Sequence, residues 1–344
     1  MADYRFLKAC RREPVDVTPV WIMRQAGRYL PEYQKIRGKN SFLKMCKTPE
    51  LAAEVTIQPI ERLGVDAAIL FSDILIPVEA MGVPLEFHDG KGPILGKEIR
   101  GQADVDALAV PDPADKVPFV MEAIRILRKA FEGKVPLIGF SGAPFTLASY
   151  IVEGGTSRNF IKLKTLMYQA PDVFRSLMKK IAKTVAAYLN AQIEAGAQAV
   201  QVFDTWAGIL TPDDYEKYAL PYTREVLESL RRNGVPVIHY ANECATLLPA
   251  IRTLPVDVIA VDWRIPLDQA AAAVGRDVAL QGNMDPTMLF LPPGQIEECV
   301  RDVLRRGGAA ASHIFNLGHG ILPPTNPDHA LAMVEAVHRL GRKG

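Results

Sequence analysis

The feature that most constrains the fold is a regular alternation of short apolar runs with stretches of helical periodicity. Runs that are apolar nearly throughout fit strands covered on both faces, and helices between successive strands make those strands parallel. The chain of 344 residues contains the runs Val20–Met23, Ala67–Phe71, Pro136–Phe140, Ala199–Phe203, Val235–Ile238, Val256–Val261, Val278–Leu280 and His313–Leu317.

Helical patterns fill most of the gaps between these runs. The clearest is Pro171–Gly196, where apolar residues recur at helical spacing before a glycine stop, and Pro212–Asn233 and Pro266–Ala273 have similar patterns. Eight strand–helix units in a chain of this length predict a single-domain (β/α)8 TIM barrel with parallel strands. A doubly wound open sheet is the alternative, but no GxGxxG motif follows any of the runs.

The sequence predicts one domain over residues 1–344. It contains no linker, internal repeat or low-complexity tract that would separate two units. Residues Gly82–Pro113 are rich in Gly, Pro and Asp. We expect them to form loops and a hairpin inserted after the second strand.

Composition limits the partners and the compartment. Lys and Arg number 40 against 39 Asp and Glu, so no net basic field attracts nucleic acid or an anionic membrane. No apolar run approaches the roughly 18 residues of a membrane span, and the N-terminus lacks a signal-peptide core. Four scattered cysteines without a CxxC motif favour reduced thiols. These features predict a cytoplasmic protein.

Polar or glycine-containing segments follow each apolar run and predict a site. The chemistry of barrel enzymes lies where the strands end at their carboxyl face. The segments at those positions are Arg24, Ser72–Asp73, Ser141–Pro144 with Tyr150 shortly after, Asp204–Trp206, His239–Tyr240, Asp262, Gly282–Asn283 and Gly318–Gly320.

Three arginines, Arg24, Arg28 and Arg37, lie close together just after the first run. Guanidinium groups keep their charge and present a planar fork of donors, which suits a ligand with several carboxylates or phosphates. The alternative is one exposed turn of helix with Arg24 and Arg28 at i and i+4. Gly27 and the flanking prolines argue against a regular helix there.

Asp73 leaves a buried strand, where an unpaired carboxylate is costly. Alone, it would more often cap the next helix. Together with several arginines, it suits a ligand that is anionic at its rim and cationic or NH-bearing at its centre.

Three further side chains are candidates with ordinary alternatives. His319 is flanked by glycines that leave its imidazole unobstructed, but it could be a core histidine. Tyr150 could donate to a carboxylate or be an interfacial aromatic residue. Thr205 could place a hydroxyl in the site or cap a helix beside Asp204.

Other chemistries find little support. His239 and Cys244 are five residues apart without the further ligands that a zinc site needs, and we expect His239 to be a core residue. Ser141 lies in Phe-Ser-Gly-Ala-Pro, which is not the G-x-S-x-G elbow of hydrolases. No P-loop occurs, and we expect no metal.

Long segments resemble the uroporphyrinogen decarboxylase family. Pro19–Glu32 and Gly139–Tyr150 look like its two signature segments, in PVWIMRQAGRYLPE and GFSGAPFTLASY. Further segments similar to that family, in the same order and over essentially the whole chain, are Phe71–Leu75, Phe203–Gly208 and Phe315–Gly320.

The resemblance implies a (β/α)8 barrel, usually a homodimer, that needs no cofactor or metal. It implies an enzyme that removes carbon dioxide from the four acetate side chains of uroporphyrinogen III, giving coproporphyrinogen III in haem and tetrapyrrole synthesis.

The resemblance also implies roles for individual residues. Arg24 and Arg28 would bind carboxylates, with Gln25, Ala26 and Gly27 between them as part of the substrate-binding segment and Arg37 beyond it. The implied catalytic residues are Asp73, Arg28 and Arg37, and Asp73 would accept hydrogen bonds from the pyrrole NH groups. Tyr150, Thr205 and His319 complete the implied substrate site, although many members have Ser where Thr205 stands.

Protonation of an electron-rich pyrrole would supply the electron sink for decarboxylation, and Asp73 would stabilise the resulting cation. The proton donor stays open among Arg28, Arg37, a bound water and His319, although arginine is a poor acid.

Two other functions compete with decarboxylation. A corrinoid or thiol methyltransferase would need zinc, and position 241, two residues after His239, is Ala. A non-catalytic tetrapyrrole carrier would not need every motif residue.

Overall fold

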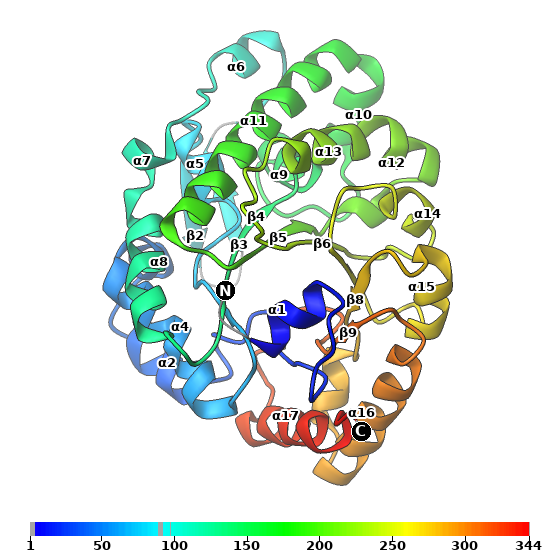
Figure 1. The fold of residues 1–344 in the computed structure, drawn as a ribbon. Coiled ribbons are helices and arrows are strands. Elements are labelled where there is room, and N and C mark those ends of the chain that lie inside the picture. The colour runs from blue at the N-terminus through cyan, green and yellow to red at the C-terminus, as the bar shows by residue number, and fades with distance from the viewer. Residues whose placement is uncertain (1–3, 89–91, 97, 344) are drawn as a thin grey trace.

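The structure is an α/β barrel with a parallel sheet at its centre and helices around it (Figure 1). The computed structural model describes residues 4–88, 92–96 and 98–343. Within these residues the main sheet has seven strands in the order β1-β4-β5-β6-β7-β8-β9, each parallel to its neighbours. The strands are β1 (Ala68–Ile69), β4 (Leu137–Gly142), β5 (Ala199–Asp204), β6 (Val237–Ala241), β7 (Val258–Val261), β8 (Ala279–Gln281) and β9 (His313–Ile314).

The first predicted strand, Val20–Met23, closes the barrel without forming a regular strand. A single parallel bridge joins Val20 to Phe315, just after β9. On the other side, the N–H of Asp66 donates to the carbonyl of Val20 at 2.7 Å, next to the start of β1. The prediction of a barrel is therefore confirmed, whereas the prediction of a strand over this whole segment was wrong.

Beyond Val20, side-chain oxygens accept the backbone hydrogen bonds that a neighbouring strand would accept in a regular sheet. The N–H of Ile22 donates to Gln25 Oε1 at 3.0 Å, and the N–H of Met23 donates to Asn316 Oδ1 at 2.9 Å. Because these donors bind side-chain oxygens, they do not pair with the backbone of a neighbouring strand. The chain therefore turns away from the sheet at the point where Arg24 follows.

Helices surround the sheet (Figure 1), and many begin on a proline, whose fixed φ suits the first turn. They are α1 (Arg5–Cys10), α2 (Pro31–Arg37), α3 (Phe42–Lys47), α4 (Pro49–Leu63), α5 (Ile76–Ala80), α6 (Gln102–Asp106), α7 (Pro113–Lys116), α8 (Pro118–Ala130), α9 (Pro144–Glu153), α10 (Ile161–Gln169), α11 (Pro171–Ala195), α12 (Pro212–Tyr218), α13 (Leu220–Glu228), α14 (Leu248–Ile251), α15 (Leu267–Val274), α16 (Pro293–Gly307) and α17 (Pro327–Leu340).

Two of the three predicted helices are confirmed nearly as expected. The long pattern forms α11, and Gly196 stops it in the left-handed region at φ 116°. The pattern at Pro266–Ala273 forms α15, shifted by one residue.

The prediction of one helix over Pro212–Asn233 was wrong in its continuity and its end. The segment forms α12 and α13, which meet at Ala219, and α13 ends at Glu228. Pro221 gives the reason, because it has no N–H for the carbonyl of Lys217 and its ring would collide with that carbonyl in a continuous helix.

The predicted hairpin is present in the insertion after the strand β1. Strands β2 (Leu85–His88) and β3 (Gly92–Leu95) pair antiparallel. The tip of the predicted hairpin at residues 89–91 lies outside the described residues.

Helix α1 lies across one end of the barrel (Figure 1). Arg5 Nη1 binds Asp66 Oδ1 at 2.9 Å, two residues before β1, so α1 is at the amino ends of the strands. Phe6, Ala9 and Cys10 are completely buried beneath it. The amino end of the barrel is thus packed with side chains, and the predicted site residues belong to the opposite end.

None of the helices in the described part of the chain combines the length and the apolar character that a bilayer crossing requires.

Candidate active site

Four of the predicted site residues converge at the carboxyl ends of the strands. The charge of Arg24 acts on the carboxyl group of Asp73, the hydroxyl of Tyr150 and the imidazole of His319. These side chains come from four separate segments: the turn after Val20–Met23, the turn after β1, the helix α9 and the loop after β9. The fold therefore brings a guanidinium, a carboxyl, a phenol and an imidazole into one electrostatic neighbourhood.

Arg24 sits in a strained backbone turn. Its φ of 62° lies in the left-handed region, which is unfavourable for a residue with a side chain. The N–H of Gln25 closes the turn on the carbonyl of Ile22 at 2.9 Å. The Gln25 side chain is completely buried, and its Nε2 donates to the carbonyl of Ala67 at 3.1 Å. Gln25 thus anchors the turn against the strand β1.

The next two residues of the predicted segment offer backbone groups. Ala26 and Gly27 are partly exposed, and their N–H groups have no acceptor among the residues that the structure describes. Free N–H groups beside an arginine suit an anionic oxygen.

Asp73 serves the fold with one carboxylate oxygen. Its Oδ1 accepts from the N–H of Leu75 at 2.8 Å, which fixes the turn before α5. Its Oδ2 has no donor among the described residues. Burial raises the pKa of Asp73 to about 6, against the Leu75 N–H and the positive charge of Arg24, which both lower it. The structure therefore places Oδ1 in the alternative role of holding a turn, and the site role of Asp73 stays a prediction for Oδ2.

His319 is held as a neutral imidazole. Its Nδ1 accepts from the N–H of Gly320 at 2.7 Å, and the rings of Tyr240 and Trp263 meet it edge-on, with centroids at 6.3 and 6.4 Å. Burial, together with the charges of Arg24 and Arg264, lowers the pKa of His319 to about 4. With Nδ1 accepting, the proton of the neutral ring is on Nε2, which is then a donor.

Tyr150 lies on α9 with its ring 6.0 Å from that of Trp206. Burial raises the pKa of its hydroxyl, and the negative charge of Asp73 raises it further. The hydroxyl therefore stays protonated at neutral pH and can donate a hydrogen bond.

Thr205 and Asp204 face different surroundings. Thr205 is partly exposed, and its hydroxyl has no partner among the described residues. It does not cap a helix, because the short 3₁₀ turn η1 (Ala207–Ile209) starts one residue later from Trp206. Asp204 is completely buried, accepts from Thr146 Oγ1 at 2.8 Å, and has its pKa raised to about 7 by burial. Of these two neighbours, Thr205 therefore has a side chain that is free to contact a ligand, whereas the carboxyl group of Asp204 is buried.

The structure divides the three clustered arginines. Arg24 and Arg28 are both exposed, and Arg37 Nη1 donates to the carbonyl of Asn40 at 3.0 Å at the end of α2. Burial raises the pKa of Tyr33, and the charges of Arg37 and Arg28 draw it back down. Arg28 and Arg37 therefore lie around Tyr33, whereas the charge of Arg24 acts on Asp73.

His239 is a core residue, as predicted. Along β6 it alternates with Tyr240, whose hydroxyl reaches the carbonyl of Gly318 at 3.0 Å on the inner side of the barrel. His239 therefore faces outward to the helices, where it is completely buried and its pKa is lowered by burial to about 4. The described residues contain no group of three or more His, Cys, Asp and Glu side chains placed to hold a metal ion.

Trp263 and Arg264, which lie beside His319, were not predicted from the sequence. The guanidinium of Arg264 lies 4.1 Å from the ring centroid of Trp263, and Arg264 Nη1 binds Asp262 Oδ1 at 3.2 Å. Through Trp263 this stack forms one wall against His319. The sequence carried a signal for them, because Trp263 and Arg264 come shortly after the end of β7, as Asp73 comes shortly after the end of β1.

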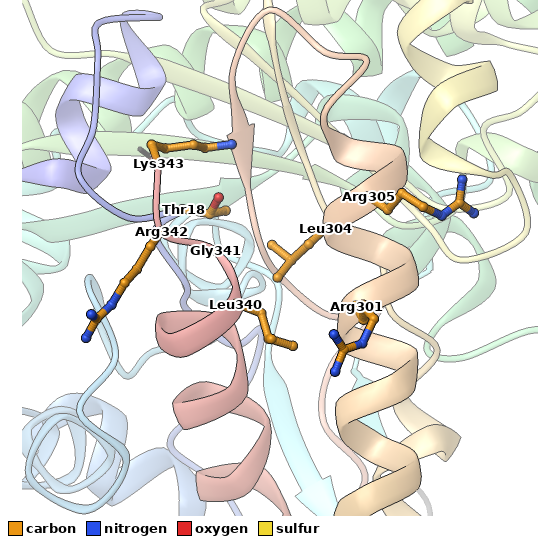
Figure 2. A pocket seen from close by; sticks show the side chains of 8 residues that line it. All are labelled: Thr18, Arg301, Leu304, Arg305, Leu340, Gly341, Arg342 and Lys343. Atoms are coloured by element: carbon orange, nitrogen blue, oxygen red, sulfur yellow. The ribbon is translucent and has the colours of Figure 1, made fainter.

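A cavity of about 280 Å³ lies at the opposite end of the barrel, between the ends of α16 and α17 (Figure 2). Its lining residues are Thr18, Arg301, Leu304, Arg305, Leu340, Gly341, Arg342 and Lys343. Thr18 precedes the first apolar run and α16 precedes β9, so the cavity is at the amino ends of the strands. Figure 2 shows Arg305 and Arg342 pointing away from the space between the helices. The cavity contains none of the predicted site residues.

Comparison with known proteins identifies the family of the chain. The family model described as "Uroporphyrinogen decarboxylase (URO-D)" matches residues 1–340. The uroporphyrinogen decarboxylase of Trichlorobacter lovleyi is 56% identical over 339 residues, which cover 98% of this chain and 99% of the relative. That of Carboxydothermus hydrogenoformans is 55% identical over 335 residues, covering 97% of this chain and 96% of the relative.

A solved structure supports the fold independently. A methyltransferase from Methanosarcina mazei superposes with a TM-score of 0.83 at 21% sequence identity, covering 97% of both chains. At this identity the likeness concerns the fold alone. Because the family model and the close relatives extend over nearly all of the sequence, the chain belongs to the uroporphyrinogen decarboxylase family.

Proposed function

We propose that this chain is a carboxy-lyase that converts uroporphyrinogen III to coproporphyrinogen III and carbon dioxide in tetrapyrrole synthesis. Family membership over the whole chain supports the reaction. The observation that carries the site is Asp73, a carboxylate with a free oxygen and a pKa of about 6 due to burial, next to the charge of Arg24. The carboxylate of Asp73 at the centre of the site matches the ring of pyrrole NH groups in the substrate. The cationic and NH donors around Asp73 match the carboxylates at the rim of that ring.

In the proposed mechanism, ionised Asp73 accepts hydrogen bonds from the pyrrole NH groups through Oδ2. Protonation of a pyrrole ring carbon produces a cation, which the carboxylate of Asp73 stabilises in surroundings that exclude most water. The bond between the acetate methylene and its carboxylate then breaks, and its electron pair neutralises the ring. Carbon dioxide leaves, the exocyclic methylene takes up a proton, and the ring proton is released. Each cycle therefore replaces one carboxylate with one proton.

The remaining residues bind and orient the substrate in this proposal. Arg24 holds a carboxylate next to the hub, and the N–H groups of Ala26 and Gly27 support the same anion, while Gln25 keeps the turn in place. Arg28 and Arg37 act further out, where Arg28 is exposed to incoming carboxylates. The side chains of Tyr150, Thr205 and His319 donate hydrogen bonds around the hub.

The state of His319 bears on the proton donor. An imidazole whose pKa is lowered to about 4 by burial carries no extra proton at neutral pH. We therefore propose that His319 orients the substrate through Nε2–H and that the ring proton comes from a water in the segment of Arg28 and Arg37.

We further propose that residues 1–344 act as one domain, in the cytoplasm, as a homodimer. Family membership over nearly the whole chain supports a single functional unit. Sedimentation of the purified protein at micromolar concentration would test the dimer, and a monomer at that concentration would contradict it.

The reaction is tested by anaerobic incubation of metal-stripped protein with uroporphyrinogen III, followed by oxidation and chromatography of the porphyrins. We expect products that lose carboxyl groups one at a time, from eight to four. Intact substrate, with a folded protein and an active control enzyme, would contradict the proposal. Bound zinc in the untreated protein would direct attention to methyl transfer.

A further inference from the structure

We infer that Gly320 is a positioning residue for Arg24, because the lack of a side chain at this glycine lets the stem of Arg24 cross the loop after β9 into the site. The inference rests on the proposed function, in which Arg24 binds a substrate carboxylate. Gly320 itself touches neither the substrate nor the reacting atoms.

The contact between the two residues is unusually close. A Cβ atom added to Gly320 would lie 2.4 Å from Arg24 Cδ and 2.9 Å from both Arg24 Cγ and Nε. Non-bonded carbon atoms normally approach to about 3.5–4.0 Å. The stem of Arg24 therefore occupies the space that the side chain of any other residue at position 320 would take.

The backbones on both sides of this contact are held in place. The N–H of Met23, directly before Arg24, donates to Asn316 Oδ1 at 2.9 Å, and the carbonyl of Met23 accepts from the N–H of Ile321 at 2.9 Å. The loop around Gly320 is thus bound to the turn of Arg24 on each side of the glycine. Because neither backbone can yield easily, a methyl group at position 320 would displace the side chain of Arg24.

Gly318, two residues earlier, makes a different kind of contact and provides a matched control. A Cβ atom on Gly318 would lie 2.4 Å from the backbone nitrogen of Trp263 and 3.0 Å from the carbonyl carbon of Asp262. Neither Gly318 nor Gly320 has a positive φ, so alanine is excluded by its neighbours and not by backbone conformation. Gly318 is required for packing of the fold, whereas Gly320 faces a flexible side chain.

The test is a set of four proteins: the natural chain, Gly320→Ala, Arg24→Ala and the double variant. Gly320→Ala is expected to raise KM for uroporphyrinogen III by about tenfold, with a smaller change in kcat, since a charge-assisted hydrogen bond is lost. In the Arg24→Ala background the same change should alter KM less than about twofold, because the two substitutions act through one contact. Gly318→Ala should lower Tm by several degrees, whereas Gly320→Ala should leave Tm nearly unchanged.

Two results would overturn the inference. One is an unchanged KM in Gly320→Ala. The other is an equal increase in KM with and without Arg24, which would assign the effect to His319, whose Nδ1 accepts from the N–H of Gly320.

A crystal structure of Gly320→Ala separates this inference from the proposed function. Displacement of the Arg24 guanidinium, with the backbone of Met23 unmoved, would support the positioning role even if the natural chain failed to decarboxylate uroporphyrinogen III. An undisplaced Arg24 in a chain with normal turnover would overturn the positioning role alone.

Discussion

Two aspartates at the two ends of the strand β1 have opposite surroundings. Asp66 precedes β1 at the amino end of the barrel, and Asp73 follows it at the carboxyl end. Asp66 accepts from Arg5 Nη1 at 2.9 Å, from the N–H of Val20 at 2.8 Å and from His338 Nε2 at 2.8 Å. Asp73 accepts from a single backbone N–H, that of Leu75.

Under the proposed function, this difference assigns stability to the amino end of the barrel and chemistry to its carboxyl end. The carboxylate of Asp66, with three hydrogen-bond donors, joins α1, the first apolar run and α17. A carboxylate with one donor has its pKa raised by burial to about 6, and its free oxygen is available to a ligand. Substitutions at the amino end should therefore affect unfolding, and substitutions at the carboxyl end should affect turnover.

The largest effect is expected for Asp73→Asn. The amide keeps the size of the side chain and an oxygen that accepts from Leu75, but it removes the charge opposite the substrate cation. We expect kcat to fall by about 10²–10³-fold, the usual loss for one electrostatic stabiliser. Urea unfolding at pH 7 should show an unchanged or higher stability, because the folded state no longer holds an unfavourable buried charge. Near-normal turnover would remove Asp73 from the hub of the site.

Asp66→Ala should give the opposite result. It removes the shared partner of Arg5 and His338, which are partly exposed, and leaves the N–H of Val20 without its acceptor, so the free energy of unfolding should fall by about 1–3 kcal/mol. The kcat of the fraction that remains folded should stay within about twofold of normal. Equal losses of kcat in this variant and in Asp73→Asn would break the distinction between the two ends.

The contrast between the ends was only partly predictable from the sequence. Asp73 was predicted because it follows an apolar run, and α11 was predicted because a 25-residue amphipathic pattern depends on local periodicity. The paired state of Asp66 was not predictable, since its partner His338 is 272 positions away along the chain.

Long-range contacts also explain the errors. The N–H of Met23 binds Asn316, 293 positions away, and this contact ends the first strand early. The division of the arginine cluster depends on where Tyr33 packs, and the wall formed by Trp263 depends on the approach of the loop after β9. Spacing along a sequence carries no information on such contacts.

Arg24→Ala should cause the next largest loss of activity after Asp73→Asn. The removal of a charge-assisted contact to a substrate carboxylate is worth about 1.5–3 kcal/mol, or roughly 10–100-fold in kcat/KM. Arg28→Ala should cost less, because the charge of Arg28 acts on Tyr33 at the edge of the site, whereas that of Arg24 acts on Asp73. The matched control is Arg301→Ala in the cavity at the amino end, for which kcat/KM should not change. Equal effects at Arg24 and Arg301 would contradict the assignment of the site to one end.

The pH dependence should follow Asp73. Its carboxyl must be ionised to stabilise a cation, so kcat/KM should fall about tenfold per pH unit below pH 6, where burial has raised its pKa. This limb should be absent from the residual activity of Asp73→Asn.

Stability should follow the opposite course over the same range. The folded state holds the proton of Asp73 up to about pH 6, and the unfolded chain releases it near pH 4. Protonation thus favours folding, and the contribution of Asp73 to stability rises as pH falls from 7 to 4. Urea unfolding of the natural chain and of Asp73→Asn at pH 5 and pH 7 would measure it, and a difference of the opposite sign would contradict the buried charge.

The smallest effect is expected for His319→Gln. The amide nitrogen of glutamine can replace the Nε2–H donor of the neutral imidazole, so kcat/KM should fall by about tenfold or less. Because burial and two neighbouring arginines lower the pKa of His319 to about 4, the pH profile between 5 and 8 should keep its shape. A loss as large as that of Asp73→Asn, or a limb that disappears with the imidazole, would make His319 the proton donor. In that case two groups at the carboxyl end, His319 and Asp73, would set the pH dependence of turnover. The contrast between the two ends of β1 would then depend on His319 as well as on Asp73.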